Sequence, residues 1–185
     1  MNCNYMEIAS FGLKGLTFIA TAIGVVLGLV QWMKNGALKR AELIDGIFEK
    51  FRTDDNVRKA VYLFDYNQDW YTEEFHGKSR RNKGAEDSVD IGLTYFSYVC
   101  YLYQTNILRD EDFELFKYTL DRAVVNRGVQ DYFYNLYHFS TRQGIPFPFP
   151  ALLKYAEQNG LLTNGFFSIK SSDSEGGCFH RFLNF

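Results

Sequence analysis

Proline and cysteine are scarce in this chain of 185 residues, which contains three of each. So few prolines, with 15 dispersed glycines, exclude a collagen-like repeat and argue against long disordered segments. The cysteines Cys3, Cys100 and Cys178 lie far apart and form no CxxC pair, so we expect neither a disulfide framework nor a zinc site. The net charge of −2 excludes a generally basic nucleic-acid-binding protein, although it leaves room for a local basic patch.

Catalytic and metal-binding motifs are also missing. The sequence has no phosphate-binding GxxxxGK[ST] loop, no HExxH zinc motif and no GxSxG nucleophile motif. Its three histidines, His76, His138 and His180, lack the spacing of a metal-ligand set. The acidic run at 110–112 fits the first turn of a helix, where carboxylates interact favourably with the helix dipole, better than it fits a metal site. We therefore expect no cofactor and no metal.

Aromatic residues are abundant instead, at 18 % of the chain with 13 Tyr and 18 Phe, so large rings must supply much of the core. Apolar residues recur mostly at helical spacing and strand signals are few, which predicts an all-α fold with a small helical bundle. The sequence divides into an N-terminal segment at 1–36, a helical domain at 37–162 and a C-terminal tail at 163–185. Helices are expected at 37–51, 57–64, 88–104, 110–124, 129–141 and 151–158.

The longest uncharged stretch, at 15–33, predicts a single membrane-spanning helix, because about 20 apolar residues span a bilayer. A cleaved signal peptide is the less favoured alternative, since no basic region precedes the stretch and no small-residue cleavage site follows it. Lys34, Lys39 and Arg40 lie just after the stretch, and positive charge marks the cytoplasmic side. The expected location is therefore the inner membrane, with the N-terminus outside and the helical domain in the cytoplasm.

Small and polar residues in this N-terminal segment repeat at alternating spacings of four and three. Such a heptad seam predicts packing against copies of the same helix, because small residues let backbones approach closely. Two assemblies remain open: a tight dimer or small bundle with a dry interface, and a larger ring whose polar face meets water. The seam consists of Lys14, Thr17, Thr21, Gly24, Gly28 and Gln31.

Two groups of residues are candidates for contact with RNA. The segment 76–84 is basic and polar, and it could bind RNA or anionic lipid head groups, although a solvated loop is the simpler interpretation. Arg127 and His138 could gather on the surface of the helical bundle and face RNA, although a packed, hydrogen-bonded histidine is the commoner role for a residue such as His138. The basic residues of the loop are Lys78, Arg80, Arg81 and Lys83.

The order of these features resembles the membrane-anchored accessory proteins of type VI-B CRISPR systems. The resemblance covers the layout of the whole chain: an N-terminal membrane helix, a basic junction at Lys39 and Arg40, and an aromatic-rich helical domain. It implies a HEPN-like fold, a ring-shaped membrane pore and a role in strengthening antiviral defence by an RNA-guided RNA nuclease. HEPN ribonucleases carry an Arg followed after four to six residues by a His, whereas ten residues separate Arg127 from His138. The layout is also similar to uncharacterised single-pass bacterial proteins.

The function expected from these features is a homo-oligomeric membrane pore or membrane effector that enhances CRISPR-linked antiviral defence by altering membrane permeability. Its expected partners are further copies of the chain, the lipid bilayer, and an RNA-guided CRISPR nuclease or RNA. Two alternatives remain open. One is a membrane-tethered HEPN-type ribonuclease that uses Arg127 and His138, and the other is a single-pass anchor that recruits a cytoplasmic partner.

Overall fold

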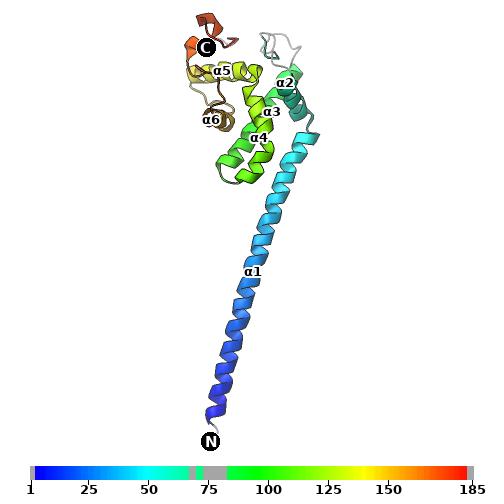
Figure 1. The fold of residues 1–185 in the computed structure, drawn as a ribbon, viewed down its shortest axis with the longest axis vertical. Helices are drawn as coiled ribbons and strands as arrows, with labels where there is room; N and C mark the ends of the chain where they lie inside the picture. Colours follow the sequence, from blue (N-terminus) through cyan, green and yellow to red (C-terminus); the bar gives the residue numbers. More distant parts are fainter. Residues whose placement is uncertain (1–2, 67–69, 73–82, 183–185) are drawn as a thin grey trace. The chain divides into compact units, whose positions relative to one another are not determined.

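The computed structural model describes the backbone of residues 3–66, 70–72 and 83–182, and the side chains of these residues except 3–20, 22, 83 and 84. The regular elements of the described residues are all helices, with no strand among them, which confirms the predicted all-α class (Figure 1). A single β-bridge, between Ser172 and Phe179, is the exception within this part of the chain. The α-helices are α1 (Cys3–Thr53), α2 (Asp55–Tyr66), α3 (Lys83–Gln104), α4 (Asp110–Val125), α5 (Arg127–Gln143) and α6 (Pro150–Gln158), followed by the 3-10 turns η2 (Ile169–Ser171) and η3 (Asp173–Glu175).

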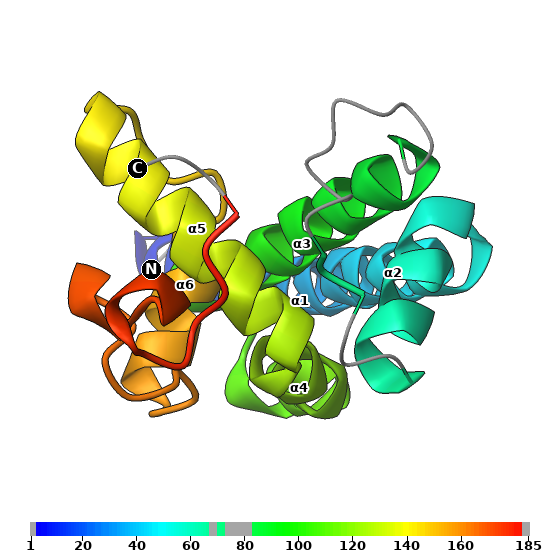
Figure 2. The ribbon, with the colours of Figure 1, turned by 90° about the horizontal axis from the view of Figure 1, so that it is seen from above.

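The chain forms two compact units, Met1–Phe48 and Glu49–Phe185. In the first unit the described backbone is one continuous helix, most of α1. In the second unit α2 packs along α3, α6 packs against α3, and α4 contacts both α2 and α5. Figure 2 shows α5 crossing the neighbouring ends of α3 and α4.

The predicted membrane-spanning helix at 15–33 is wrong: in the part of the chain that the structure describes, no helix combines the length and the apolar character needed to cross a membrane. The inner-membrane location and its topology depended on that helix and are corrected with it.

Local side-chain chemistry fixes where the helices begin and end. Asp54 Oδ1 accepts hydrogen bonds from the N–H groups of Asn56 (2.9 Å) and Val57 (3.2 Å), which caps the first turn of α2. At the start of α4 the Asp112 carboxylate accepts from Arg109 N at 3.0 Å, so the acidic run at 110–112 acts as a helix start. Gly144 ends α5 in the left-handed conformation, at φ 67°, which glycine adopts without strain.

Aromatic rings fill the core of the second unit. Phe51, in the last turn of α1, stacks on Phe96 of α3 and Phe116 of α4 with ring centroids 5.6 and 5.7 Å apart. Fully burying one such ring contributes on the order of 2 kcal/mol. The largest fully buried side chains are Tyr134, Phe64, Phe96, Phe116, Phe133, Phe166 and Phe179.

The end of α2 is held to the start of α5 by Asn126. Its Oδ1 accepts from the Trp70 indole N–H at 2.9 Å, and its Nδ2 donates to the carbonyl of Phe64, also at 2.9 Å. The same Oδ1 accepts from Val129 N at 3.1 Å and so caps α5. Asn126 is fully buried, so its side-chain amide has no access to water. The three bonds satisfy this amide, which would otherwise be costly in free energy to bury. They fix the position of α2, on which the candidate site lies.

Candidate binding groove on helix α2

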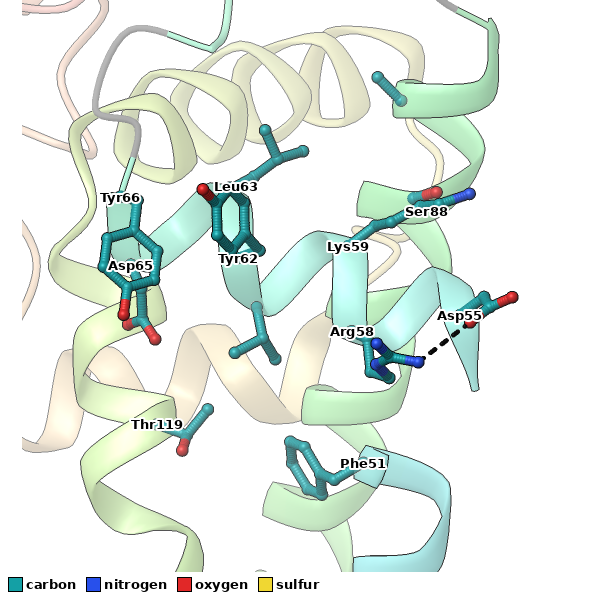
Figure 3. A pocket seen from close by; sticks show the side chains of 12 residues that line it. Phe51, Asp55, Arg58, Lys59, Tyr62, Leu63, Asp65, Tyr66, Ser88 and Thr119 are labelled. Carbon is teal, nitrogen blue, oxygen red and sulfur yellow. Dashed lines mark hydrogen bonds and ion pairs between the residues drawn. The ribbon is translucent and has the colours of Figure 1, made fainter. Parts of the chain in front are cut away.

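A cavity of about 760 Å³ lies over α2 within the second unit, and we refer to it as the α2 groove (Figure 3). Most of its described lining comes from α2 itself. Phe51 from the last turn of α1, Ala85 and Ser88 from α3, and Thr119 from α4 complete that lining. Its apolar contributors on α2 are Val61, Tyr62, Leu63 and Tyr66.

The pattern of α2 explains why aromatic side chains face this groove. Val57, Ala60 and Phe64 recur at helical spacing and are buried, so they form the inner face of the helix. Tyr62 and Tyr66 are four residues apart on another face, where they are neighbours, with ring centroids 4.9 Å apart. They are 66 % and 76 % exposed, respectively. The helix thus buries one apolar face and presents a second aromatic surface to solvent.

Close contact with α3 fixes the other side of α2. A Cβ atom at Gly92 of α3 would lie only 2.4 Å from the Cβ of Ala60, so a glycine is needed for the two helices to approach at this point. Ser88 Oγ donates to Asn56 Oδ1 at 3.0 Å, one helical turn before the Gly92–Ala60 contact. The groove therefore rests on a helix pair whose spacing is set by packing.

Charged groups in the α2 groove are mostly neutralised within the protein. Asp55 pairs with Arg58 at 3.3 Å. Asp65 pairs with Arg122 of α4 at 3.4 Å, and Arg122 Nη2 also donates to the Asp65 carbonyl at 2.9 Å. Within the described part of the chain, Lys59 is the one charged lining residue with no hydrogen bond or ion pair. Both carboxylates of the described lining are thus paired with guanidinium groups.

Arg127 and His138 are not brought together. They are eleven positions apart on α5, which corresponds to about 16 Å along the helix axis. His138 is 8 % exposed, and its Nε2 lies 3.0 Å from the Phe166 carbonyl, so Nε2 must carry the hydrogen that this acceptor receives. Burial lowers the pKa of His138, against the opposing effect of that hydrogen bond. The imidazole is therefore a packed, neutral contact between α5 and the segment that follows α6.

Arg127 contacts the C-terminal segment instead. Its Nε donates to the buried Asp131 carboxylate at 3.1 Å, and its Nη2 donates to the carbonyl of Cys178 at 2.5 Å. Burial raises the pKa of Asp131, although Arg127 and the backbone N–H of His180 act in the opposite direction. Asn135 Nδ2 donates to the His180 carbonyl at 2.6 Å and thus extends the same set of contacts. These groups hold the C-terminal segment against α5, and most of their polar atoms form hydrogen bonds within this contact.

The seam residues with described side chains are all exposed on α1. A Cβ atom added at Gly24 or Gly28 would have no other atom within 4 Å, so both positions are open to close approach. The side chains of Lys14 and Thr17 lie outside the described set. Those described are Thr21, Gly24, Gly28 and Gln31.

The predicted basic loop falls mostly outside the described residues. This holds for Lys78, Arg80 and Arg81, whereas Lys83 is the first residue of α3, with an undescribed side chain. As for metals, the described residues contain no group of three or more His, Cys, Asp or Glu side chains placed to hold an ion.

The α2 groove was not predicted from the sequence. The available signal was the pair Tyr62 and Tyr66, two rings one helical turn apart on a helix whose other face already provides its buried side chains. Comparisons with protein-family models, curated proteins and solved structures give no match.

Proposed function

We propose that the second unit is a non-catalytic binding module that takes an apolar small molecule into the α2 groove. The observation that carries this proposal is the exposed pair of neighbouring rings, Tyr62 and Tyr66, beside a cavity of about 760 Å³. Small-molecule sites are clefts of roughly 300–1,000 Å³ lined mainly by apolar and aromatic groups. The groove has both the size and the lining of such a site.

Two exposed tyrosines favour a ligand with a flat apolar part. A phenol ring offers an apolar face while its hydroxyl stays hydrated, so it can cover a ligand without leaving a polar group unsatisfied. Ring-on-ring contact adds roughly 0.5–1.5 kcal/mol beyond the burial of area. The pairing of Asp55 with Arg58 and of Asp65 with Arg122 favours binding over acid–base catalysis at this place.

The first prediction tests the groove with N-phenyl-1-naphthylamine, a neutral aromatic probe whose fluorescence rises in apolar surroundings. Tyr62→Ala is expected to weaken binding about tenfold, since the loss of one ring contact and its buried area is worth roughly 1–2 kcal/mol. Fluorescence titration of the full chain gives the dissociation constant.

Tyr101→Ala is the matched control. Tyr101 is also exposed, but it lies on α3 and does not line the groove. Its removal is expected to leave the dissociation constant unchanged. Equal binding by wild type and Tyr62→Ala, or equal losses in the two variants, would show that the probe does not occupy the α2 groove and would reject the proposal.

We also propose that α1 associates with further copies of itself. In the interval 23–33 its large apolar side chains are exposed, and an exposed patch of this kind on a protein usually marks an interaction surface. A second copy is the occupant that the heptad seam favours, because that spacing is typical of helices that pair with themselves. The exposed large side chains are Ile23, Val25, Val26, Leu27, Leu29, Val30, Trp32 and Met33.

A further inference from the structure

We infer that the ligand of the α2 groove is an amphipathic monoanion, a small molecule with an apolar body and one negatively charged group that binds Lys59. This inference rests on the proposed function and adds the charge of the ligand and the residue that recognises it. Carboxylates, sulfonates and phosphate monoesters with a hydrocarbon or aromatic body belong to this class.

Lys59 carries the one charge of the described groove lining that is not balanced by an ion pair. Four charged residues line the described part of the groove, and two of these, Asp55 and Arg58, neutralise each other. Asp65 is neutralised by Arg122. The Lys59 ammonium has no hydrogen bond or ion pair within the described residues, so the groove presents one positive charge next to its apolar surface.

The position of Lys59 relative to the tyrosines sets the shape of the ligand. Lys59, Tyr62 and Tyr66 are spaced by three and four residues along α2. In Figure 3 the Lys59 side chain extends toward Ser88 of α3, on the side away from the two tyrosines. At the rise of an α-helix, Tyr62 lies about 4 Å and Tyr66 about 10 Å from Lys59 along the axis. A ligand at least that long can therefore place its anionic group at Lys59 and its apolar body on the two rings.

Ligands of other charge fit this arrangement less well. A cation would meet the Lys59 ammonium with both groove carboxylates already paired to arginines. A neutral ligand would displace water from Lys59 without offering the ammonium a new partner, which costs free energy. An anion replaces that water with a charge-assisted hydrogen bond. The size of the cavity favours a free small molecule over a polymer.

The test compares two probes that share one aromatic skeleton and differ by a sulfonate. They are 1-anilinonaphthalene-8-sulfonate, an anion, and N-phenyl-1-naphthylamine, which is neutral. Binding in the α2 groove is defined as the binding that Tyr62→Ala removes. For this binding, the wild-type protein is expected to have an affinity for the anion about fivefold higher than for the neutral probe, the size expected of a partly exposed charge pair. Lys59→Gln should abolish that fivefold advantage by weakening binding of the anion, without weakening binding of the neutral probe.

Lys154→Gln is the matched control, because Lys154 is an exposed lysine on α6 that does not line the groove. It should preserve the preference for the anion. Lys59→Glu, as a second variant, should reverse the preference. Thermal unfolding followed by circular dichroism identifies any variant that has lost its fold.

The outcomes separate the two proposals. If the neutral probe requires Tyr62 but the anion has no advantage, or if Lys59→Gln weakens both probes equally, the inferred charge of the ligand is wrong and the groove still stands. If neither probe depends on Tyr62, both the groove and the inference about its ligand fail.

Discussion

At the scale of single residues, Gly128 shows how closely α5 approaches the indole of Trp70. A Cβ atom at this position would lie 2.4 Å from Trp70 Nε1 and 2.6 Å from Cε2. The ring has little freedom to yield, because its N–H donates to Asn126 and the ring packs against Phe64 and Tyr132. The glycine is therefore required by space at this contact.

We predict that Gly128→Ala destabilises the second unit by about 2 kcal/mol, the usual cost of forcing an extra methyl group into a packed site. The free energy of unfolding in urea, followed by tryptophan fluorescence, measures the effect. Gly46→Ala is the control, since a Cβ atom there has nothing within 4 Å and alanine is the better helix former. A Gly128 variant as stable as wild type would show that the indole moves aside freely.

The roles of individual residues followed from the sequence only where the partners were local. The acidic run at 110–112 was correctly assigned to a helix start, because a cap depends on residues three positions away. The partners of Arg127 and His138 lie in the C-terminal segment, at Cys178 and Phe166. Helical spacing places two residues on one helix and gives no information about which distant segment covers them. The positions of Lys59 and Tyr62 in the α2 groove likewise depend on tertiary packing, which the sequence pattern does not reveal.

At the scale of elements, α5 joins much of the second unit to its C-terminal segment. Tyr134 stacks on Phe179 with centroids 4.3 Å apart, and its hydroxyl donates to the carbonyls of Ser168 and Ile169 at 2.9 Å. His138 adds the contact to Phe166 one turn later. The stretch expected to be a tail thus packs on a helix as far as the structure describes it.

His138 makes this junction sensitive to acid. Because burial lowers its pKa in the folded protein, the unfolded chain takes up a proton first. The contribution of neutral His138 to stability is therefore complete above its ordinary pKa of about 6.5 and is lost as the pH falls below that value. His138→Gln keeps a donor for the Phe166 carbonyl and does not titrate. We predict that it reduces the loss of stability between about pH 7.5 and pH 5.5.

Urea unfolding of wild type and His138→Gln at the two pH values measures this slope. The His138 variant is expected to be less stable at neutral pH, because its side chain fills the site less well, so the slope and not the absolute stability is diagnostic. An identical slope in wild type and His138→Gln would contradict the prediction.

The bounds of the helices were easier to predict than the character of the longest one. The predicted helices at 110–124 and 129–141 match α4 and α5 closely, since the periodicity of their apolar residues is strong. The uncharged stretch at 15–33 was taken for a membrane span, yet it belongs to a helix that continues to Thr53 through Gln31, Lys34 and Asn35. The length of an uncharged stretch can be read from the sequence. The apolar surface of the whole helix also depends on the polar residues next to that stretch.

At the scale of the whole molecule, the chain combines a continuous helix with a compact helical unit. The all-α class followed from composition and periodicity, because both depend on local preference. The pore expected from the CRISPR resemblance stays a prediction. A self-associating α1 would bring several copies of the second unit together, and so would bring several α2 grooves into one assembly, which makes oligomeric state the decisive property at this scale.

The last prediction concerns that state. Gly24 and Gly28 share the seam face of α1, and the space around each is open to a second helix. Leucine at either position would push two helix backbones apart, because close approach depends on the absence of a side chain there. We therefore predict that Gly24→Leu or Gly28→Leu lowers the mass of the purified protein toward that of a single chain, 21.5 kDa, while wild type has a multiple of it.

Val26→Leu is the matched control, since it adds one methylene on a different face of the same helix and should leave the assembly intact. Light scattering coupled to size-exclusion chromatography gives the mass of all four proteins, and circular dichroism verifies that each remains helical. Leucine also adds apolar surface, which by itself favours association. A loss of mass in the two glycine variants therefore runs against the general hydrophobic trend and identifies close backbone packing as the cause. If both glycine variants keep the wild-type mass, the seam is not part of the interface.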